Sequence, residues 1–283
     1  MRDVTEYLRL QATYCTRLGS PLYAYLLERA AEDVVAGGPV AAVLAGYPHA
    51  PVASAMALRL MGGVHRLVLT GEASALAAHY PSAGGDGDPE GAWSAFHALV
   101  TARTERLRRL MEHGVQTNEV GRSAALVGGF LTVASETGLP LRCLEIGTSG
   151  GLNLRWDHFR YEAGDQGWGD PSSGVVLGDF QAGAPPFDTA VSVVERSGCD
   201  PAPADPTTDA GRLTLLSYVW ADQTDRLARL RAACEIARRV PATIVRANAA
   251  DWLEKVLARP VAGVATVVFH SIVLQYLDPS SLD

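Results

Sequence analysis

The sequence predicts an α/β protein in two parts, a helical N-terminal domain at 1–138 and a parallel sheet with helices at 139–283. In the first part, apolar residues recur at helical spacing between turn-forming residues. In the second part, short β-branched runs alternate with helical stretches, which is typical of a parallel sheet with right-handed crossovers. The first of these runs ends in the glycine cluster Gly147–Gly151, as a buried strand does where it turns into a helix.

Capping and stop residues divide the first part into helices. Asp3 and Ser20 are suitable N-caps, and Pro21 suits the first position of the second helix. Gly37–Gly38 predicts the end of that helix, and Gly62–Gly63 predicts that the next helical stretch is interrupted.

Longer helices follow an exposed loop. Turn-forming residues at Pro81–Gly91 predict the loop, and Ala92–His113 and Ser123–Thr137 each predict one helix. In the second part, Asp222 is the expected N-cap of a helix that ends before Pro241.

A polar segment, Gln116–Arg122, lies just before the helix that leads into the first strand. Its amides, carboxylate and guanidinium are candidates to reach over a ligand-binding loop, with Asn118 and Glu119 addressing a substrate. The alternative is that Asn118 and Glu119 only cap the helix.

Four runs are predicted as strands of one sheet: Leu141–Ile146, Phe159–Glu162, Ala242–Arg246 and Val264–Phe269. The segment at about 163–206 is too long for one crossover and predicts an insertion over the sheet. The chain ends shortly after the fourth strand, so the sequence is either truncated there or forms a smaller sheet. A fourth strand left as an apolar edge favours association, which makes a homodimer a candidate assembly.

The glycine cluster is the most informative motif. A strand that runs into glycines and then a helix exposes backbone amides and allows a ligand to approach closely. The dinucleotide pattern G-x-G-x-x-G does not fit, because Ser149 stands two residues after Gly147, and the loop has no Lys for a phosphate-binding pattern. An acid, Glu145, precedes the first glycine by two residues, which gives the pattern E-x-G-x-x-G-G.

This pattern resembles the first motif of class I S-adenosylmethionine-dependent methyltransferases. The resemblance implies a Rossmann-like sheet with S-adenosylmethionine as the cofactor, its methionine part and ribose across the glycines. It also implies an acid on the ribose at the end of the second strand, and an Asp with an apolar neighbour against adenine after the third. The cofactor-binding residues implied in this way are Glu145, Gly147, Gly150, Gly151, Glu162, Asp251 and Trp252.

Each of these assignments has a simpler alternative. The glycine cluster is also what a tight strand-to-helix turn without a ligand requires. Glu162 is also compatible with a solvated surface glutamate, and Asp251 with an N-cap of the helix that follows it.

His270 is the candidate catalytic base. It follows the fourth predicted strand directly, at the strand end where open α/β sheets place ligands, and an imidazole pKa near 6.5 suits general base catalysis. The alternative is a histidine hydrogen-bonded to backbone. Ser271 lacks a G-x-S-x-G elbow, so a hydrolase is disfavoured.

The chain as a whole resembles an uncharacterised bacterial family, domain of unknown function 2332. Six segments carry the resemblance: QTNEVGRSAAL (Gln116–Leu126), LEIGTSGGLNL (Leu144–Leu154), WGDPSS (Trp168–Ser173), VERSGCD (Val194–Asp200), YVWADQTDRLARL (Tyr218–Leu230) and VVFHSIVLQYL (Val267–Leu277). The family name states no activity.

Composition limits the classes of binding partner and the cellular compartment that are expected for this protein. With 24 Lys and Arg against 31 Asp and Glu, the net charge of −7 gives nucleic-acid binding no electrostatic support. The four Cys are scattered without a C-x-x-C pair, which predicts neither a disulfide framework nor a metal site. No run suits a membrane span and the N-terminus lacks an apolar signal core, so a cytoplasmic protein is expected.

The function expected from these features is methyl transfer from S-adenosylmethionine to an unidentified small molecule. The alternative is a non-catalytic ligand-binding or interaction protein on a degenerate methyltransferase fold. A nicotinamide enzyme is disfavoured by the glycine spacing.

Overall fold

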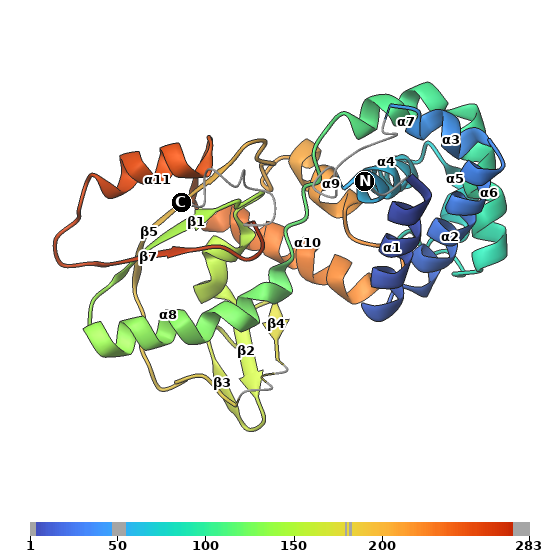
Figure 1. Ribbon diagram of the computed structural model, residues 1–283. Coiled ribbons are helices and arrows are strands. Elements are labelled where there is room, and N and C mark those ends of the chain that lie inside the picture. The colour runs from blue at the N-terminus through green and yellow to red at the C-terminus, as the bar shows by residue number, and fades with distance from the viewer. Residues whose placement is uncertain (1–3, 47–54, 179, 181–182, 274–283) are drawn as a thin grey trace. The chain divides into compact units, whose positions relative to one another are not determined.

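The computed structural model describes residues 4–46, 55–178, 180 and 183–273 (Figure 1). It is an α/β structure with a four-stranded parallel sheet and a separate three-stranded sheet. The chain divides into two compact units, and the first consists of Met1–Val115 together with Leu216–Leu227. The first unit therefore ends before residue 138, and it takes in a later segment that the sequence places in the second part.

The first unit is helical. Its elements are α1 (Val4–Arg17), α2 (Pro21–Val35), α3 (Pro39–Leu44), α4 (Met56–Leu69), α5 (Ser74–Ala77), the 3-10 turn η2 (Pro81–Ala83), α6 (Pro89–Ala102) and α7 (Thr104–Met111). Apolar faces of these helices form one core, in which Leu26, Leu60 and Phe96 are fully buried. Asp3, the expected first N-cap, lies outside the described residues.

The expected interruption at Gly62–Gly63 is wrong, because α4 runs through both glycines. Gly62 serves close packing instead. A Cβ at position 62 would lie 2.5 Å from Cε1 of Tyr218, so the helix tolerates only glycine beside this ring.

The expectation of a single helix at 92–113 is also wrong, because the helix is interrupted. It is two helices, α6 and α7, separated at Arg103, whose φ of −127° and ψ of 24° are not helical. The hydroxyls of Thr101 and Thr104 donate to carbonyls four residues back at 2.8 and 2.9 Å, and such side-chain bonds compete with the helical ladder and bend helices.

Asp222 does not cap the helix that follows it in the chain. Its carboxylate accepts hydrogen bonds from Ser20 Oγ and from Leu22 N at 3.0 Å, both at the N-terminus of α2. The cause is that Trp220 and Ala221 are buried in the core of the helical unit, which brings Asp222 to α2.

The second unit consists of residues 116–215 and 228–283. Its elements in chain order are η3 (Val120–Arg122), α8 (Ser123–Thr137), β1 (Leu141–Ile146), η4 (Leu152–His158), β2 (Arg160–Ala163), β3 (Gln166–Trp168), β4 (Val176–Leu177), β5 (Val193–Asp200), α9 (Asp209–Ser217), α10 (Thr224–Arg239), β6 (Thr243–Arg246), α11 (Ala249–Leu257) and β7 (Ala265–Phe269). The last two residues of α9 and the first turn of α10 belong to the helical unit.

The parallel sheet has the strand order β6-β5-β1-β7. Its second strand in chain order is therefore β5, and the expectation that Phe159–Glu162 fills this place is wrong. Those residues belong mainly to β2, in the separate sheet β3-β2-β4. The segment 163–206, expected as an insertion, contains β5. Its charged residues Glu195 and Arg196 hide the strand pattern, although the last four residues of β5 are buried.

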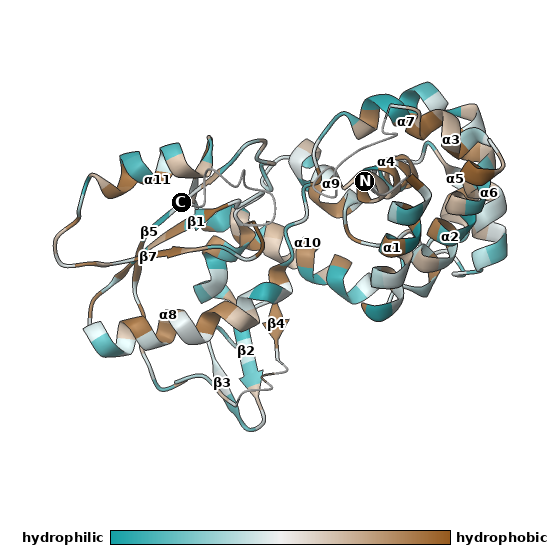
Figure 2. Ribbon diagram, viewed as in Figure 1, coloured by the Kyte–Doolittle hydropathy of each residue, from teal (hydrophilic) through white to brown (hydrophobic). Residues whose placement is uncertain are grey.

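Helices cover both faces of the parallel sheet, with α8 on one side and α11 on the other in Figure 1. On the α8 side, the rings of Phe130 and Phe269 of β7 pack edge to face, with 4.9 Å between their centroids. On the α11 side, Trp252 packs with Leu144 and Ile146 of β1. All six residues of β1 are buried, and Figure 2 shows β7 largely in the hydrophobic colour. The predicted bounds of α8 and β1 are confirmed.

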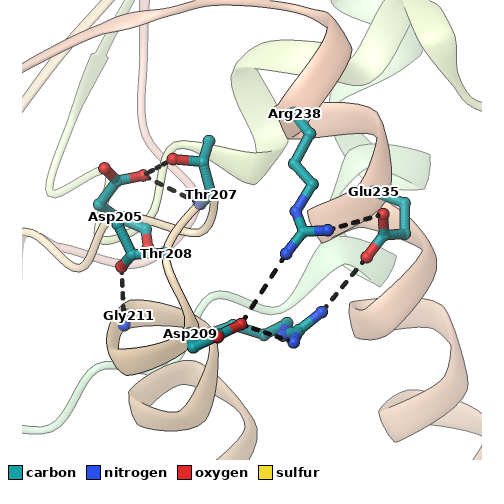
Figure 3. Close-up of polar contacts among 8 residues, drawn as sticks. Asp205, Thr207, Thr208, Asp209, Gly211, Glu235 and Arg238 are labelled. Carbon is teal, nitrogen blue, oxygen red and sulfur yellow. Dashed lines mark hydrogen bonds and ion pairs between the residues drawn. The ribbon is translucent and has the colours of Figure 1, made fainter.

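The connection from β5 to α9 is held by local polar contacts (Figure 3). Asp205 accepts hydrogen bonds from Thr207 N at 2.9 Å and Thr207 Oγ1 at 2.7 Å, and Thr208 Oγ1 accepts from Gly211 N at 3.1 Å. A Cβ at position 211 would lie 1.9 Å from Asp205 O, so the turn requires glycine there. The start of α9 is thereby fixed relative to the end of β5.

The four cysteines are buried with free thiols, and burial raises their pKa values, that of Cys143 to about 11. Among the described residues, no helix is both long and apolar enough to cross a membrane.

Candidate functional site

The loop Gly147–Gly151 leaves the carboxyl end of β1, beside the point where the strand order reverses between β1 and β7. Its first and last glycines have φ of +65°, a conformation that favours glycine. A Cβ on Gly151 would lie 2.3 Å from Ile244 Cδ1, and a Cβ on Gly150 would lie 2.8 Å from Leu215 Cδ1. Neighbouring protein side chains therefore occupy the space that a Cβ at 150 or 151 would need. A larger residue at 150 would disturb the loop itself.

Protein acceptors occupy most of the amides around this turn. They are a strand carbonyl, a carboxylate, a loop carbonyl and a side-chain amide. The bonds are Thr148 N to Cys199 O (3.0 Å), Ser149 N to Asp200 Oδ2 (3.0 Å), Gly151 N to Thr148 O (2.7 Å) and Leu152 N to Asn118 Oδ1 (3.0 Å). Because these donors are taken, the loop differs from a phosphate-binding loop, whose amides point at the ligand.

Asp200 is the residue of the site that sequence reasoning missed. It ends β5, is 8% exposed, and accepts hydrogen bonds from Ser149 N (3.0 Å), Ala202 N (2.8 Å) and Gln116 Nε2 (3.3 Å). Gln116 also accepts a bond from Ser149 Oγ at 2.5 Å. The signal was an acid that closes a run of buried residues, placed within the VERSGCD segment.

Glu145 is 1% exposed and accepts a hydrogen bond from Thr148 Oγ1. Burial raises the pKa of Glu145 to about 8, against the lowering effect of that bond. Among its charged neighbours, the guanidinium of Arg155 lowers the pKa, the carboxylate of Asp200 raises it, and Arg122 lowers it. Glu145 therefore gives up its proton less readily than an ordinary glutamate.

Arg155 fixes the carbonyl side of the loop. Its Nη1 donates to Gly151 O at 2.6 Å and to Gly150 O at 3.4 Å, and its Nε donates to Val240 O at 3.0 Å. Burial lowers its pKa to about 10. This cation is engaged in holding the backbone of the loop.

The polar segment lies beside the glycine loop, as expected. Asn118 caps Leu152 N, as given above. The Glu119 carboxylate accepts a bond from Gly121 N at 2.8 Å and lies 3.8 Å from Arg229 Nη1. Both side chains thus have structural contacts of the capping kind, and a role toward a substrate stays a prediction.

Glu162 is not at the end of the sheet's second strand. It lies in β2, its side chain is 55% exposed, and its Oε1 is 3.3 Å from Arg160 Nε. The argument that placed it on a ribose therefore no longer applies, and Asp200 holds the position that the argument required.

Asp251 and Trp252 follow the third strand in chain order, β6. The helix α11 begins at Ala249, and Asn248 Oδ1 caps it by accepting from Ala250 N at 2.8 Å. Asp251 is therefore not the cap, and its side chain is exposed in the first turn. Trp252 is 9% exposed and packs into the core under the loop.

His270 follows β7 directly, and β7 pairs with β1. Its Nδ1 is buried and has no hydrogen-bond partner among the described residues. The next residue, Ser271, accepts a hydrogen bond from Arg122 Nη1 at 3.3 Å. His270 thus lies at the strand end where open α/β sheets place ligands, and its role as a base stays a prediction.

A family model described as "Uncharacterized protein conserved in bacteria (DUF2332)" matches residues 5–282, nearly the whole chain. The chain belongs to the DUF2332 family. No curated protein and no solved structure matches it. The description of the family states no activity, so the methyltransferase resemblance stays a prediction for this DUF2332 chain.

The DUF2332 site combines acids with a loop whose amides are occupied. Glu145 and Asp200 lie at the carboxyl ends of neighbouring strands, and the exposed Asp251 follows the next strand. In the described part of the chain, no three His, Cys, Asp or Glu side chains gather as metal ligands do. The arrangement favours a ligand that carries positive charge and offers hydrogen-bond donors.

Proposed function

We propose that this protein binds S-adenosylmethionine at the carboxyl edge of the parallel sheet and transfers its methyl group to a small molecule. The strand order carries the proposal. In chain order, β1, β5, β6 and β7 are arranged 3-2-1-4, which is the order of the first four strands in Rossmann-like, doubly wound sheets. In such sheets, ligands bind outside the carboxyl ends of the strands where the order reverses.

The acids of the site support an S-adenosylmethionine ligand. Glu145, near the end of β1, is the counterpart of the acid that meets the cation of the methionine part. Asp200, at the end of β5, takes the place of the acid that binds the ribose. Asp251, after β6, is free of a capping role and suits the adenine amino group.

The glycine loop argues against a phosphate-bearing ligand. A phosphate needs free backbone amides or a cation, whereas the amides bond to protein acceptors and Arg155 bonds to loop carbonyls. S-Adenosylmethionine carries no phosphate and so needs no free backbone amides, and its ammonium pairs with Glu145 once that acid has lost its proton.

Methyl transfer requires mainly that the protein position the two reactants. S-Adenosylmethionine supplies a methyl group on sulfur that an acceptor attacks in line, and the thioether leaves. The loop and the acids hold the ligand in place, which lowers the entropic part of the barrier. His270 Nδ1, buried and unpartnered among the described residues, accepts the proton of an acceptor that must lose one.

Binding by titration calorimetry tests the proposal. Wild-type protein should bind S-adenosylmethionine and its demethylated product, S-adenosylhomocysteine. Asp251→Asn should weaken binding severalfold, because the amide keeps an acceptor for the adenine amino group and loses the charge that strengthens the bond. Glu254→Gln, exposed on the same helix, is the matched control and should leave the affinity unchanged. Absence of binding at millimolar ligand contradicts the proposal.

A non-catalytic ligand-binding protein on the same fold is the second candidate. The observation in its favour is that Asp200 already accepts three hydrogen bonds from the protein, so a ribose must compete with them. S-Adenosylhomocysteine binding in a protein that never yields methylated product from a metabolite extract would favour this candidate.

A further inference from the structure

Glu145 and Asp200 are two buried acids on one face of the sheet. The register pairs Glu145 with Gly198 on the neighbouring strand, and Asp200 stands two residues beyond Gly198. Side chains two apart on a strand point to the same face, so both carboxyl groups lie on the same side. They are 1% and 8% exposed. Burial raises the pKa of Glu145 most, and the nearby charge of Asp200 adds to this effect.

Hydrogen-bond donors are shared unequally between the two acids. Three N–H groups face Asp200, those of Ser149, Ala202 and Gln116. Among the described residues, one hydroxyl, that of Thr148, bonds to Glu145. Donors favour the charged form of the group they face, and the small number of donors at Glu145 favours its protonated form.

The other charged and titratable groups around Glu145 come from every element packed against it. The cations are Arg155 of η4 and Arg122 of η3. The thiols of Cys143 on β1 and Cys199 on β5 also interact with Glu145, and His270 follows the residue that pairs with it on β7. Arg155 donates to loop carbonyls and Arg122 donates to Ser271.

We propose that the unliganded protein keeps one proton on Glu145, and that an ammonium-bearing ligand at the glycine loop displaces this proton into solvent. The O–H bond of Glu145 breaks, the resulting carboxylate pairs with the ligand ammonium, and buffer takes up the proton. The inference rests on the proposed function for the identity of the ligand. The raised pKa of Glu145 agrees with it. Affinity then rises with pH, about tenfold per pH unit below pH 8.

Calorimetry in buffers of different ionisation enthalpy tests the coupling. At pH 7, S-adenosylhomocysteine should release about one proton per molecule bound, so the observed heat should change with the buffer. Methylthioadenosine, which lacks the ammonium, is the matched ligand and should release none. A heat of S-adenosylhomocysteine binding that is the same in every buffer overturns the inference.

Infrared spectroscopy of the unliganded protein tests the proton separately. Wild type at pH 7 should show the C=O stretch of a protonated carboxyl, and the band should be lost in Glu145→Gln and kept in Glu254→Gln. Absence of such a band overturns the inference even if the ligand binds. A band without any ligand binding refutes the proposed function and the coupling, yet upholds the proton on Glu145, so the two failures are distinguishable.

Discussion

Glu145 shows how one side chain couples the stability of the protein to pH. Its ordinary pKa is 4.5, and burial raises it to about 8 in the folded chain. Between these values the folded state binds a proton that the unfolded state has lost. Stability therefore falls as pH rises through this window, by at most about 1.4 kcal/mol per pH unit, and levels off above pH 8.

Glu145→Gln should remove this dependence. The amide keeps an acceptor for Thr148 Oγ1 and imitates the protonated acid, so the variant should gain stability relative to wild type as pH rises from 5 to 8. Urea denaturation at each pH measures the difference. A difference between variant and wild type that stays constant across the window would contradict the assigned protonation.

At the scale of elements, two helical glycines should respond oppositely to replacement by alanine. Gly62 in α4 admits the Tyr218 ring, whereas a Cβ on Gly129 in α8 would meet nothing within 4 Å. Gly62→Ala should destabilise the protein by about 1–3 kcal/mol through overpacking. Gly129→Ala should stabilise it by about 0.5–1 kcal/mol through helix propensity. Thermal unfolding of both variants checks the pair, and effects of the same sign would contradict the packing argument.

The sequence predicted those elements whose stop signals are local. The helix α8 and the strand β1 have their predicted bounds, because Gly138 ends the helix in a left-handed conformation and the strand is apolar throughout. It missed β5, because charged residues interrupt the apolar pattern of that strand, and with β5 it missed Asp200. It misread Gly62 and Asp222, because the partners of both residues are distant in sequence.

At the scale of the whole molecule, the edge of the parallel sheet bears on assembly. Among the described strands, β7 pairs with β1 alone, and Val268 on β7 is 41% exposed. An apolar edge is a template for another chain, so we expect the protein to self-associate. Val268→Lys should lower the associated fraction, since a lysine on an edge strand opposes pairing. Light scattering that finds wild type monomeric at every concentration would contradict this expectation.

Residues 216–227 belong to the helical unit but are synthesised long after its other helices, and this order delays completion of the helical core. Helices α1 to α7 leave the ribosome about a hundred residues before Trp220, which completes their core, and Asp222, which caps α2. At 5–20 residues per second, this delay is on the order of 5–20 s. During that time the nascent helices expose the apolar surface that Trp220 later covers, so this is the interval in which the chain is most prone to aggregate.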